Sequence, residues 1–215
     1  MNSFNCRGEA PALCNLCPRL VEYRETNASA EPNWFNGAVP SFGPQDARLL
    51  IVGLAPGRMG ANRTGRPFTG DYAGDLLYAT LSEFGFARGT YGARIDDGFE
   101  LVDCMVSNAV RCAPPENKPT TAEINQCRQF LTARIACLPN LKVIVALGRI
   151  AHDQTLKSLG LPQSTYPFGH GNRHLLAEGP CLYDSYHCSR YNTNTRRLTA
   201  QMFQDVFRAI RAELA

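Results

Sequence analysis

Several kinds of segment are missing from this sequence of 215 residues. No apolar run reaches the roughly 20 residues that a membrane-spanning helix needs. The first residues, MNSFNCRGEAPALC, lack the basic flank and the apolar stretch of a secretory signal. Internal repeats and low-complexity tracts are absent as well. These absences argue against a membrane or repeat protein, and we expect a cytoplasmic location.

The overall charge is also small and says little about the partner. It is +3, from 22 Lys and Arg against 19 Asp and Glu. A hydrophobic content of 44% is that of an ordinary globular domain, and the length fits one large domain better than two small ones. We therefore predict a single domain over residues 1–215 with an ample core.

Short apolar runs alternate with helical patterns along the chain. The strand-like runs cover residues 48–53, 101–107, 141–147 and 181–186. This alternation predicts an α/β fold, a three-layer α/β/α arrangement around a central, mostly parallel four-stranded sheet. Residues 173–177 could add a short extra strand, and the N-terminal segment 1–45 fits a loop or short helix.

The most unusual stretch runs from Gly53 to Gly74, GLAPGRMGANRTGRPFTGDYAG, and contains six glycines. It leaves the carboxyl end of a predicted strand, where α/β proteins usually bind ligands. It matches neither G-x-x-x-x-G-K-[ST] nor G-x-G-x-x-G, which argues against a mononucleotide-binding enzyme. We interpret this glycine loop as the candidate active site.

Arginines gather beside this loop and beside a second one near the C-terminus, a placement that suits an anionic ligand such as phosphate. They are Arg58, Arg63 and Arg66 in the first, and Arg190, Arg196 and Arg197 near the second.

Two further polar residues follow predicted strands. Asn108 ends the second and His187 follows the fourth, so both should lie at the same sheet edge as the glycine loop. A turn role for Asn108 and a surface role for His187 remain open. Asp71 can be either a catalytic carboxylate or the N-cap of the next helix.

Cysteines form two pairs with metal-binding potential. Cys14 and Cys17 have the C-x2-C spacing. Cys112 and Cys127 lie at the two ends of a short segment made of a Pro-rich loop and the start of a predicted helix, so they can come together at little entropic cost. Four thiolates can hold zinc or a [4Fe-4S] cluster, and the spacing alone does not choose between them. Cys127 as a buried apolar residue is the alternative.

The other cysteines have no such pattern. Cys104, Cys137 and Cys181 are expected in the core, Cys6 in a mobile tail, and Cys188 inside the second loop.

Four motifs occur in order along the chain. They are Gly53-Leu54-Ala55-Pro56-Gly57, Thr64-Gly65-Arg66-Pro67-Phe68-Thr69-Gly70-Asp71, Asn108-x3-Cys112-x-Pro114-Pro115-x-Asn117-Lys118 and His187-x-Ser189-x2-Asn192. Together they resemble the uracil-DNA glycosylase superfamily, and more narrowly family 5, the UDGb-type enzymes. The related family 4 enzymes have an acidic residue where this chain has Leu54. The match runs from Cys14 to about Thr199.

The resemblance implies a monomeric, monofunctional DNA-repair glycosylase. Such an enzyme flips uracil, and other deaminated bases such as hypoxanthine, out of DNA and hydrolyses the N-glycosidic bond. The resemblance also implies a [4Fe-4S] cluster on the two cysteine pairs, with zinc as the alternative. A protein of this kind that binds lesions without cutting, or holds them covalently, would carry a reactive residue near His187, and none is evident.

Roles for individual residues follow from the chemistry of this reaction together with the resemblance. Asp71 would activate or position water and stabilise the sugar cation, His187 would donate to the leaving base, and Asn108 would read the base edge or orient water. Base-binding roles fall to Gly53, Leu54, Ala55, Gly57 and the stacking ring of Phe68.

Contacts with the DNA backbone and minor groove would come from the second loop and two further arginines. The residues are Arg63, Ser189, Arg190, Asn192 and Arg196. Two positions depart from the family pattern: Ala73 stands where Ser is common, and Cys188 stands where Pro is common.

Overall fold

The computed structural model describes residues 8–215, and Cys6 lies outside the described residues. A five-stranded sheet in the order β4-β1-β5-β7-β6 forms the centre. Four of its strands are parallel: β1 (Leu49–Gly53), β4 (Cys104–Asn108), β5 (Val143–Leu147) and β7 (Cys181–Ser185). They correspond to the four predicted strands, so the fold class is confirmed.

The predicted strand count and one boundary were wrong. A short antiparallel edge strand, β6 (Arg173–His174), adds a fifth member to the sheet. The run 101–107 is also split, because Asp103 has a φ of +57° and interrupts it. Leu101 belongs instead to a separate two-stranded sheet of β2 (Ala87–Arg88) and β3 (Glu100–Leu101).

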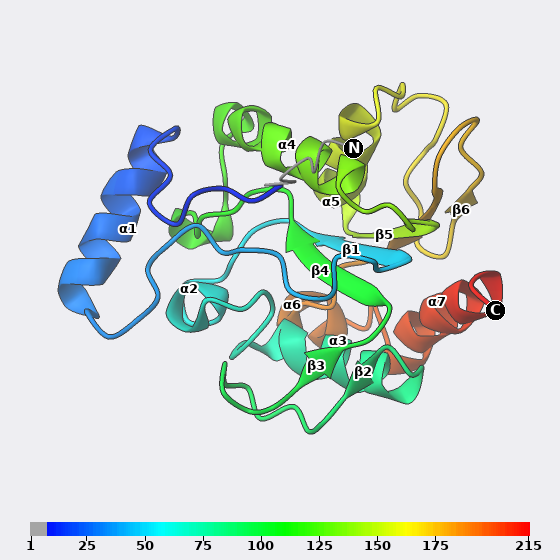
Figure 1. Cartoon of the computed structure of the whole chain (residues 1–215), viewed down its shortest axis with the longest axis horizontal. Coiled ribbons are helices and arrows are strands. Elements are labelled where there is room, and N and C mark those ends of the chain that lie inside the picture. The colour runs from blue at the N-terminus through cyan, green and yellow to red at the C-terminus, as the bar shows by residue number, and fades with distance from the viewer. Residues whose placement is uncertain (1–7) are drawn as a thin grey trace, which may run out of the picture.

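Helices cover both faces of the sheet (Figure 1). On one face lie α3 (Tyr72–Glu83) and α7 (Ala200–Glu213), and on the other lie α4 (Thr121–Ala136) and α5 (Arg149–Ser158). The strands are buried on both sides, and alternate residues enter the two cores: Ile51 packs toward α3 and α7, Val52 toward α4 and α5.

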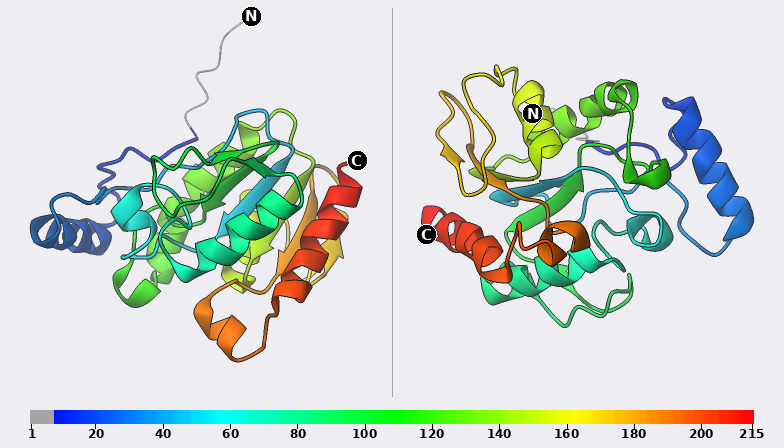
Figure 2. Two further views of the ribbon diagram at one scale, coloured as in Figure 1. Left: turned by 90° about the horizontal axis from the view of Figure 1, so that it is seen from below. Right: turned by 180° about the vertical axis from the view of Figure 1, so that it is seen from behind.

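The remaining elements lie around this three-layer unit. Helix α1 (Pro18–Ala30) stands off from the sheet in both views of Figure 2. Short helices α2 (Ala61–Thr64), η1 (Pro115–Asn117) and α6 (Arg190–Asn194) lie in the loops after β1, β4 and β7. No helix in residues 8–215 is long and apolar enough to cross a membrane.

A buried charge pair links α5 to the sheet beneath the second loop. His152 Nδ1 lies 2.6 Å from Asp184 Oδ1, and its Nε2 lies 2.8 Å from the Tyr166 carbonyl oxygen. Both neighbours are acceptors, so the imidazole can satisfy both only when both nitrogens carry protons. Burial lowers the pKa of His152, but the hydrogen bond to Asp184, the charge of Asp184 and the bond to Tyr166 together outweigh it, so the net pKa is raised.

Stability should therefore depend on pH through His152. A raised pKa in the folded state gives a contribution that is complete below about pH 6.5 and is lost as the pH rises through the folded-state pKa. We expect the urea unfolding free energy to fall between neutral and alkaline pH more steeply in the wild type than in His152→Gln. Parallel pH slopes for the two proteins would contradict this pairing.

Candidate active site

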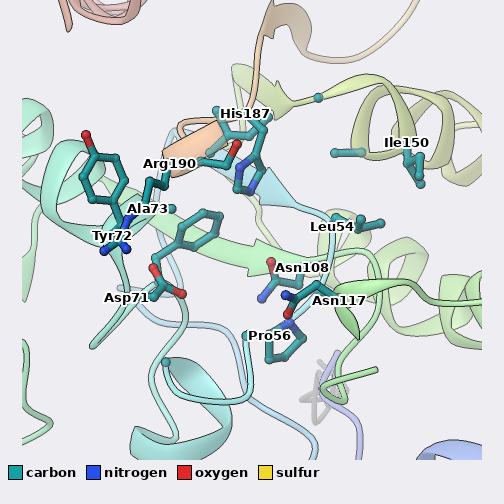
Figure 3. A pocket seen from close by; sticks show the side chains of 18 of the residues that line it. Leu54, Pro56, Asp71, Tyr72, Ala73, Asn108, Asn117, Ile150, His187 and Arg190 are labelled. Atoms are coloured by element: carbon teal, nitrogen blue, oxygen red, sulfur yellow. The ribbon is translucent and has the colours of Figure 1, made fainter. Parts of the chain in front are cut away.

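A cavity of about 550 Å³ opens at the carboxyl edge of the four parallel strands. The register aligns these strand ends, because Gly53 pairs with Asn108 and Leu147 pairs with Ser185. Each strand thus delivers the loop that follows it to the same place. Figure 3 shows Asp71 and His187 on two sides of the cavity, and Asn108 beside Asn117.

Gly53 lets two side chains meet at the base of this cavity. A Cβ atom at this position would come within 2.4 Å of Asn108 Oδ1 and 2.6 Å of Phe68 Cζ. Any side chain would therefore displace one of the two groups. Beyond Gly53 the loop continues alongside the chain after β4, with Ala109 N–H donating to Gly53 O and Val110 N–H to Leu54 O, each at 2.9 Å.

The other predicted base-binding residues also line the cavity. Leu54, Ala55 and Gly57 all belong to its wall, and Ala55 additionally packs against the cysteine cluster described below. The glycine loop therefore separates the cavity from that cluster.

Phe68 belongs both to the core and to the cavity. It is 6% exposed and joins the apolar cluster beneath α3, and it also lines the cavity. Its ring stacks against His187 with centroids 5.8 Å apart and planes inclined by 27°. Its φ of +53° is rare for a bulky residue, so the surrounding contacts must hold this conformation.

Asp71 is the N-cap of α3, and it also faces the cavity. Its Oδ1 accepts the Gly74 N–H at 3.0 Å, while Oδ2 lies over the backbone of Gly57 and Gly60. Desolvation raises the pKa of this carboxyl despite the capping hydrogen bond, which lowers it. The two roles left open by the sequence are thus structurally compatible.

His187 reaches the cavity from the loop after β7. Within residues 8–215 neither ring nitrogen has a hydrogen-bond partner, and burial lowers the pKa of the ring to about 4. Asn192 holds the loop in place by donating from Nδ2 to the His187 carbonyl at 2.8 Å. A neutral imidazole with free nitrogens is thereby presented to the cavity.

Two amide side chains line the opposite wall. Asn108 is 3% exposed, and its Oδ1 has no hydrogen-bond partner in the described part of the chain. Asn117 lies beside it (Figure 3), on a segment where Glu116 and Asn117 both have positive φ values, 54° and 57°. A buried amide without a partner is costly unless a ligand completes its bonds.

Only some of the predicted arginines face solvent near the cavity. Arg63, Arg190, Arg196 and Arg197 are exposed, and the half-buried Arg58 lines the cavity. Arg190 lines the cavity with its guanidinium 5.2 Å from the Tyr72 ring, and Ser189 caps α6 beside it. Arg66 is different: it is 3% exposed and cannot bind an external anion, so its assignment to an anion-binding cluster was wrong.

Sequence reasoning missed the contribution of the start of α5 to the cavity wall. Arg149 and Ile150 open α5, directly after β5 and Gly148, and both are exposed there. Because β5 is parallel to its neighbours, its carboxyl end could have been expected at this edge. Asn117 lay within a quoted motif but had no assigned role.

The four predicted metal-ligand cysteines come together away from this cavity. Cys14, Cys17, Cys112 and Cys127 line one small hollow between α1 and α4, and none is in a disulfide. The backbone N–H of Arg111 donates to Cys127 Sγ at 3.2 Å. Arg24, which is buried, donates to the Cys14 carbonyl oxygen at 2.9 Å and lies 4.0 Å from Cys112 Sγ.

Burial determines the protonation state of two of these cysteines. Burial raises the pKa of Cys112 to about 11 and that of Cys127 to about 12, so both thiols are protonated at neutral pH unless a bound cation stabilises the thiolates.

The spacing of the sulfurs also distinguishes the possible cations. In residues 8–215 only the His152, His174 and Asp184 ligand atoms form a set of three lying within 4.8 Å of one another. No three of the four cysteine sulfurs form such a set, whereas the sulfurs around one tetrahedral zinc ion lie ~3.8 Å apart. The histidine group is already hydrogen-bonded, with His174 Nε2 2.9 Å from Asp184 Oδ2.

The other cysteines are mostly buried as predicted. Cys104 and Cys181 lie in the core, whereas Cys137 is half-buried at the C-terminal end of α4. Cys188 is fully buried, and its Sγ donates to the Ala73 carbonyl oxygen at 3.4 Å. The two residues that depart from the family pattern are therefore in contact, and they join the His187 loop to the start of α3.

Comparisons with known proteins agree with this geometry. The model of the Uracil DNA glycosylase superfamily matches residues 40–211. A Type-5 uracil-DNA glycosylase from Thermus thermophilus is 46% identical over 199 residues, which is 90% of each chain. One from Pyrobaculum aerophilum is 38% identical over 93% of this chain and 88% of its own. A Type-4 uracil-DNA glycosylase from Thermotoga maritima is 37% identical, but over only 61% of this chain.

The low pKa of His187 has a spectroscopic consequence. A value of about 4 means that the ring is neutral throughout the range from pH 5 to 8. We expect its ¹⁵N and ¹³C ring resonances to stay constant across that range, with His187→Gln used to assign them. Titration with a midpoint near the ordinary value of about 6.5 would contradict the buried, neutral state.

Proposed function

Because the chain belongs to the uracil-DNA glycosylase superfamily and matches its type-5 members over nearly its whole length, we propose that it is a monofunctional uracil-DNA glycosylase. It removes uracil from DNA by hydrolysis and leaves an abasic site, acting as a monomer in the cytoplasm. The observation that carries the proposal is the cavity where the unpartnered Asn108 amide and the Phe68 ring meet, with Asp71 and His187 beside them.

Recognition begins with a base flipped out of the duplex, which costs a few kcal/mol. The Phe68 ring supplies the stacking face, and the buried Asn108 amide supplies hydrogen bonds to the base edge. A base that completes these bonds recovers the cost of the unpaired amide, whereas one with the wrong edge does not. Discrimination at Asn108 follows from this difference.

Bond cleavage places negative charge on the departing base. The electron pair of the N-glycosidic bond leaves with the base, and a donor beside the base oxygen stabilises it. His187 fills this role as a neutral N–H donor, since its ring is held uncharged and its nitrogens are free. A neutral donor stabilises the developing anion and keeps its own proton.

Positive charge develops at the same time on the sugar. Asp71 Oδ2 faces the cavity while Oδ1 stays on the helix cap, so the carboxylate can stabilise that charge without losing its anchor. A water held by Asp71 adds its oxygen to the anomeric carbon and gives its proton to the carboxylate. The raised pKa of Asp71 favours this proton transfer.

A covalent intermediate formed by a cysteine has no support at this site. It needs a thiol facing the cavity, and Cys188 of the His187 loop is buried and donates to Ala73 O. Burial also raises the pKa of Cys188, which further suppresses the thiolate.

The range of bases extends beyond uracil in our proposal. A cavity of about 550 Å³ is ample for a purine, and Asn117 provides a second amide beside Asn108. Hypoxanthine, with a carbonyl edge related to that of uracil, is the expected second substrate. Exposed Arg63, Arg149, Arg190 and Arg196 supply phosphate contacts around the mouth.

A [4Fe-4S] cluster fits the cysteine hollow better than a single zinc ion. No three of the sulfurs lie within 4.8 Å of one another, and the N–H donor to Cys127 and the buried Arg24 suit the thiolate ligands of a cluster. Bound there, it would fix α1 and the loop after β4 to the core and take no part in the bond cleavage.

The direct test is excision from duplexes that contain uracil or hypoxanthine, with alkali used to reveal abasic sites. Strand breaks that need alkali are expected. Breaks without alkali would indicate a lyase, and a stable protein–DNA adduct would indicate the covalent binder.

Asp71→Asn should separate catalysis from capping, because Asn retains an N-cap oxygen. We expect single-turnover excision to fall by about 100-fold or more, with DNA affinity changed by less than about three-fold. Asp75→Asn, in the next turn of α3, is the matched control. If Asp71→Asn excised uracil at the wild-type rate, Asp71 would serve only as a cap.

Protein purified without oxygen should be brown and contain iron and sulfide. Cys112→Ser is expected to lose most of this colour, because one of four ligands is removed from a buried site. Cys181→Ser, which changes a buried cysteine outside the hollow, should retain it. Stoichiometric zinc without iron in the wild type would rule out the cluster.

A further inference from the structure

Arg66, two residues before the predicted base-stacking residue Phe68, lies inside a box of aromatic rings. Its side chain is 3% exposed. The guanidinium carbon lies 5.1 to 5.9 Å from four ring centroids. These rings belong to Phe42, Tyr78, Tyr91 and Phe99. Cation–π contacts of this kind are strongest where water is excluded.

The donors of Arg66 are all directed at the protein. Nη1 and Nη2 donate to the two oxygens of Asp97 at 2.8 and 2.7 Å, and Nε donates to Thr69 Oγ1 at 2.7 Å. Asp97 is itself buried and also accepts the N–H groups of Gly92 and Phe99. Arg66 thus ties the glycine loop to the segment 91–99, and its bond to Asp97 holds the pKa of that carboxyl well below its usual value.

Phe68 needs this support because its backbone is in a disfavoured conformation. Phe68 has a φ of +53° and lies between Arg66 and Thr69 in the chain. The Arg66 guanidinium donates to the Thr69 hydroxyl and so links the residues on the two sides of Phe68. Tyr91, one of the ring residues, donates from its hydroxyl to Phe68 O at 3.3 Å and accepts the Gly70 N–H at 3.2 Å. Tyr91 therefore contacts both the Arg66 guanidinium and the backbone at Phe68 and Gly70.

We propose that Arg66 is a positioning residue for base recognition, which holds Phe68 in its left-handed conformation so that the ring faces the cavity. This inference rests on the proposed function, in which Phe68 is the stacking face for the flipped base. The side chain itself touches no substrate. It acts through the backbone between residues 66 and 69. Only a planar guanidinium can donate to both oxygens of Asp97 and to the Thr69 hydroxyl at the same time.

The test compares two readouts in folded variants. Arg66→Lys keeps the charge and loses the fork, and Asp97→Asn changes the partner without altering its shape. We expect both to lower single-turnover uracil excision about ten-fold or more, in keeping with the strain at Phe68. Their affinity for duplex DNA with a tetrahydrofuran abasic-site analogue, which has no base to stack, should stay within about two-fold.

Matched controls come from the neighbouring ion pair of Arg94 and Asp96, which is exposed in the same segment. Arg94→Lys and Asp96→Asn should change neither readout. If Arg66→Lys does not fold, judged by circular dichroism, Asp97→Asn decides the question with the same two measurements.

A double variant separates positioning from general stability. Phe68→Leu should lower excision, and adding Asp97→Asn to it should cause little further loss, because both changes remove the same stacking face. Independent, multiplicative losses would overturn the inference, as would wild-type excision by Asp97→Asn while Phe68→Leu is impaired. Wild-type excision by Phe68→Leu would instead refute the stacking role in the proposed function.

Discussion

The side chains of Phe68 and Asn108 both lie against Gly53, at the point where β1 ends, and the rest of the site depends on this arrangement. A Cβ atom at Gly53 would lie 2.4 Å from one group and 2.6 Å from the other. The lack of a side chain at Gly53 therefore allows the loop after β1, which carries Phe68, to lie close to Asn108 at the end of β4. Parallel register then brings His187 from β7 to the same place, with its ring stacked on Phe68.

Burial of these groups also sets their charge states. It lowers the pKa of His187 and raises that of Asp71, so the imidazole is neutral while the carboxylate accepts protons more readily than usual. Desolvation thus makes His187 a neutral N–H donor to the base and makes Asp71 a better acceptor for the proton of the attacking water. A second buried group, the cysteine cluster, supports the wall of the cavity through Ala55.

The sequence predicted the four parallel strands because each is a short apolar run, and it placed the glycine loop, Asn108 and His187 at one edge because parallel strands share it. Leu54, Phe68, Asp71, Asn108 and His187 from its four motifs line one cavity, and the type-5 relatives confirm the family-5 resemblance. Arg66 was misassigned, since an arginine in a glycine-rich loop looks exposed until the distant rings of the segment 91–99 close around it. The break at Asp103 and the amide of Asn117 depend on backbone conformations that no periodic pattern reveals.

The central claim is that a flipped base stacks on Phe68 and is hydrogen-bonded at its edge by the Asn108 amide, with His187 at its oxygen. A structure of the protein bound to duplex DNA that contains a non-hydrolysable 2′-fluoro-deoxyuridine analogue tests it most directly. We expect the uracil ring stacked on Phe68, an Asn108 amide bond to its edge, and Asp71 facing the sugar. A base that remains in the duplex, or that occupies another surface, would contradict the account.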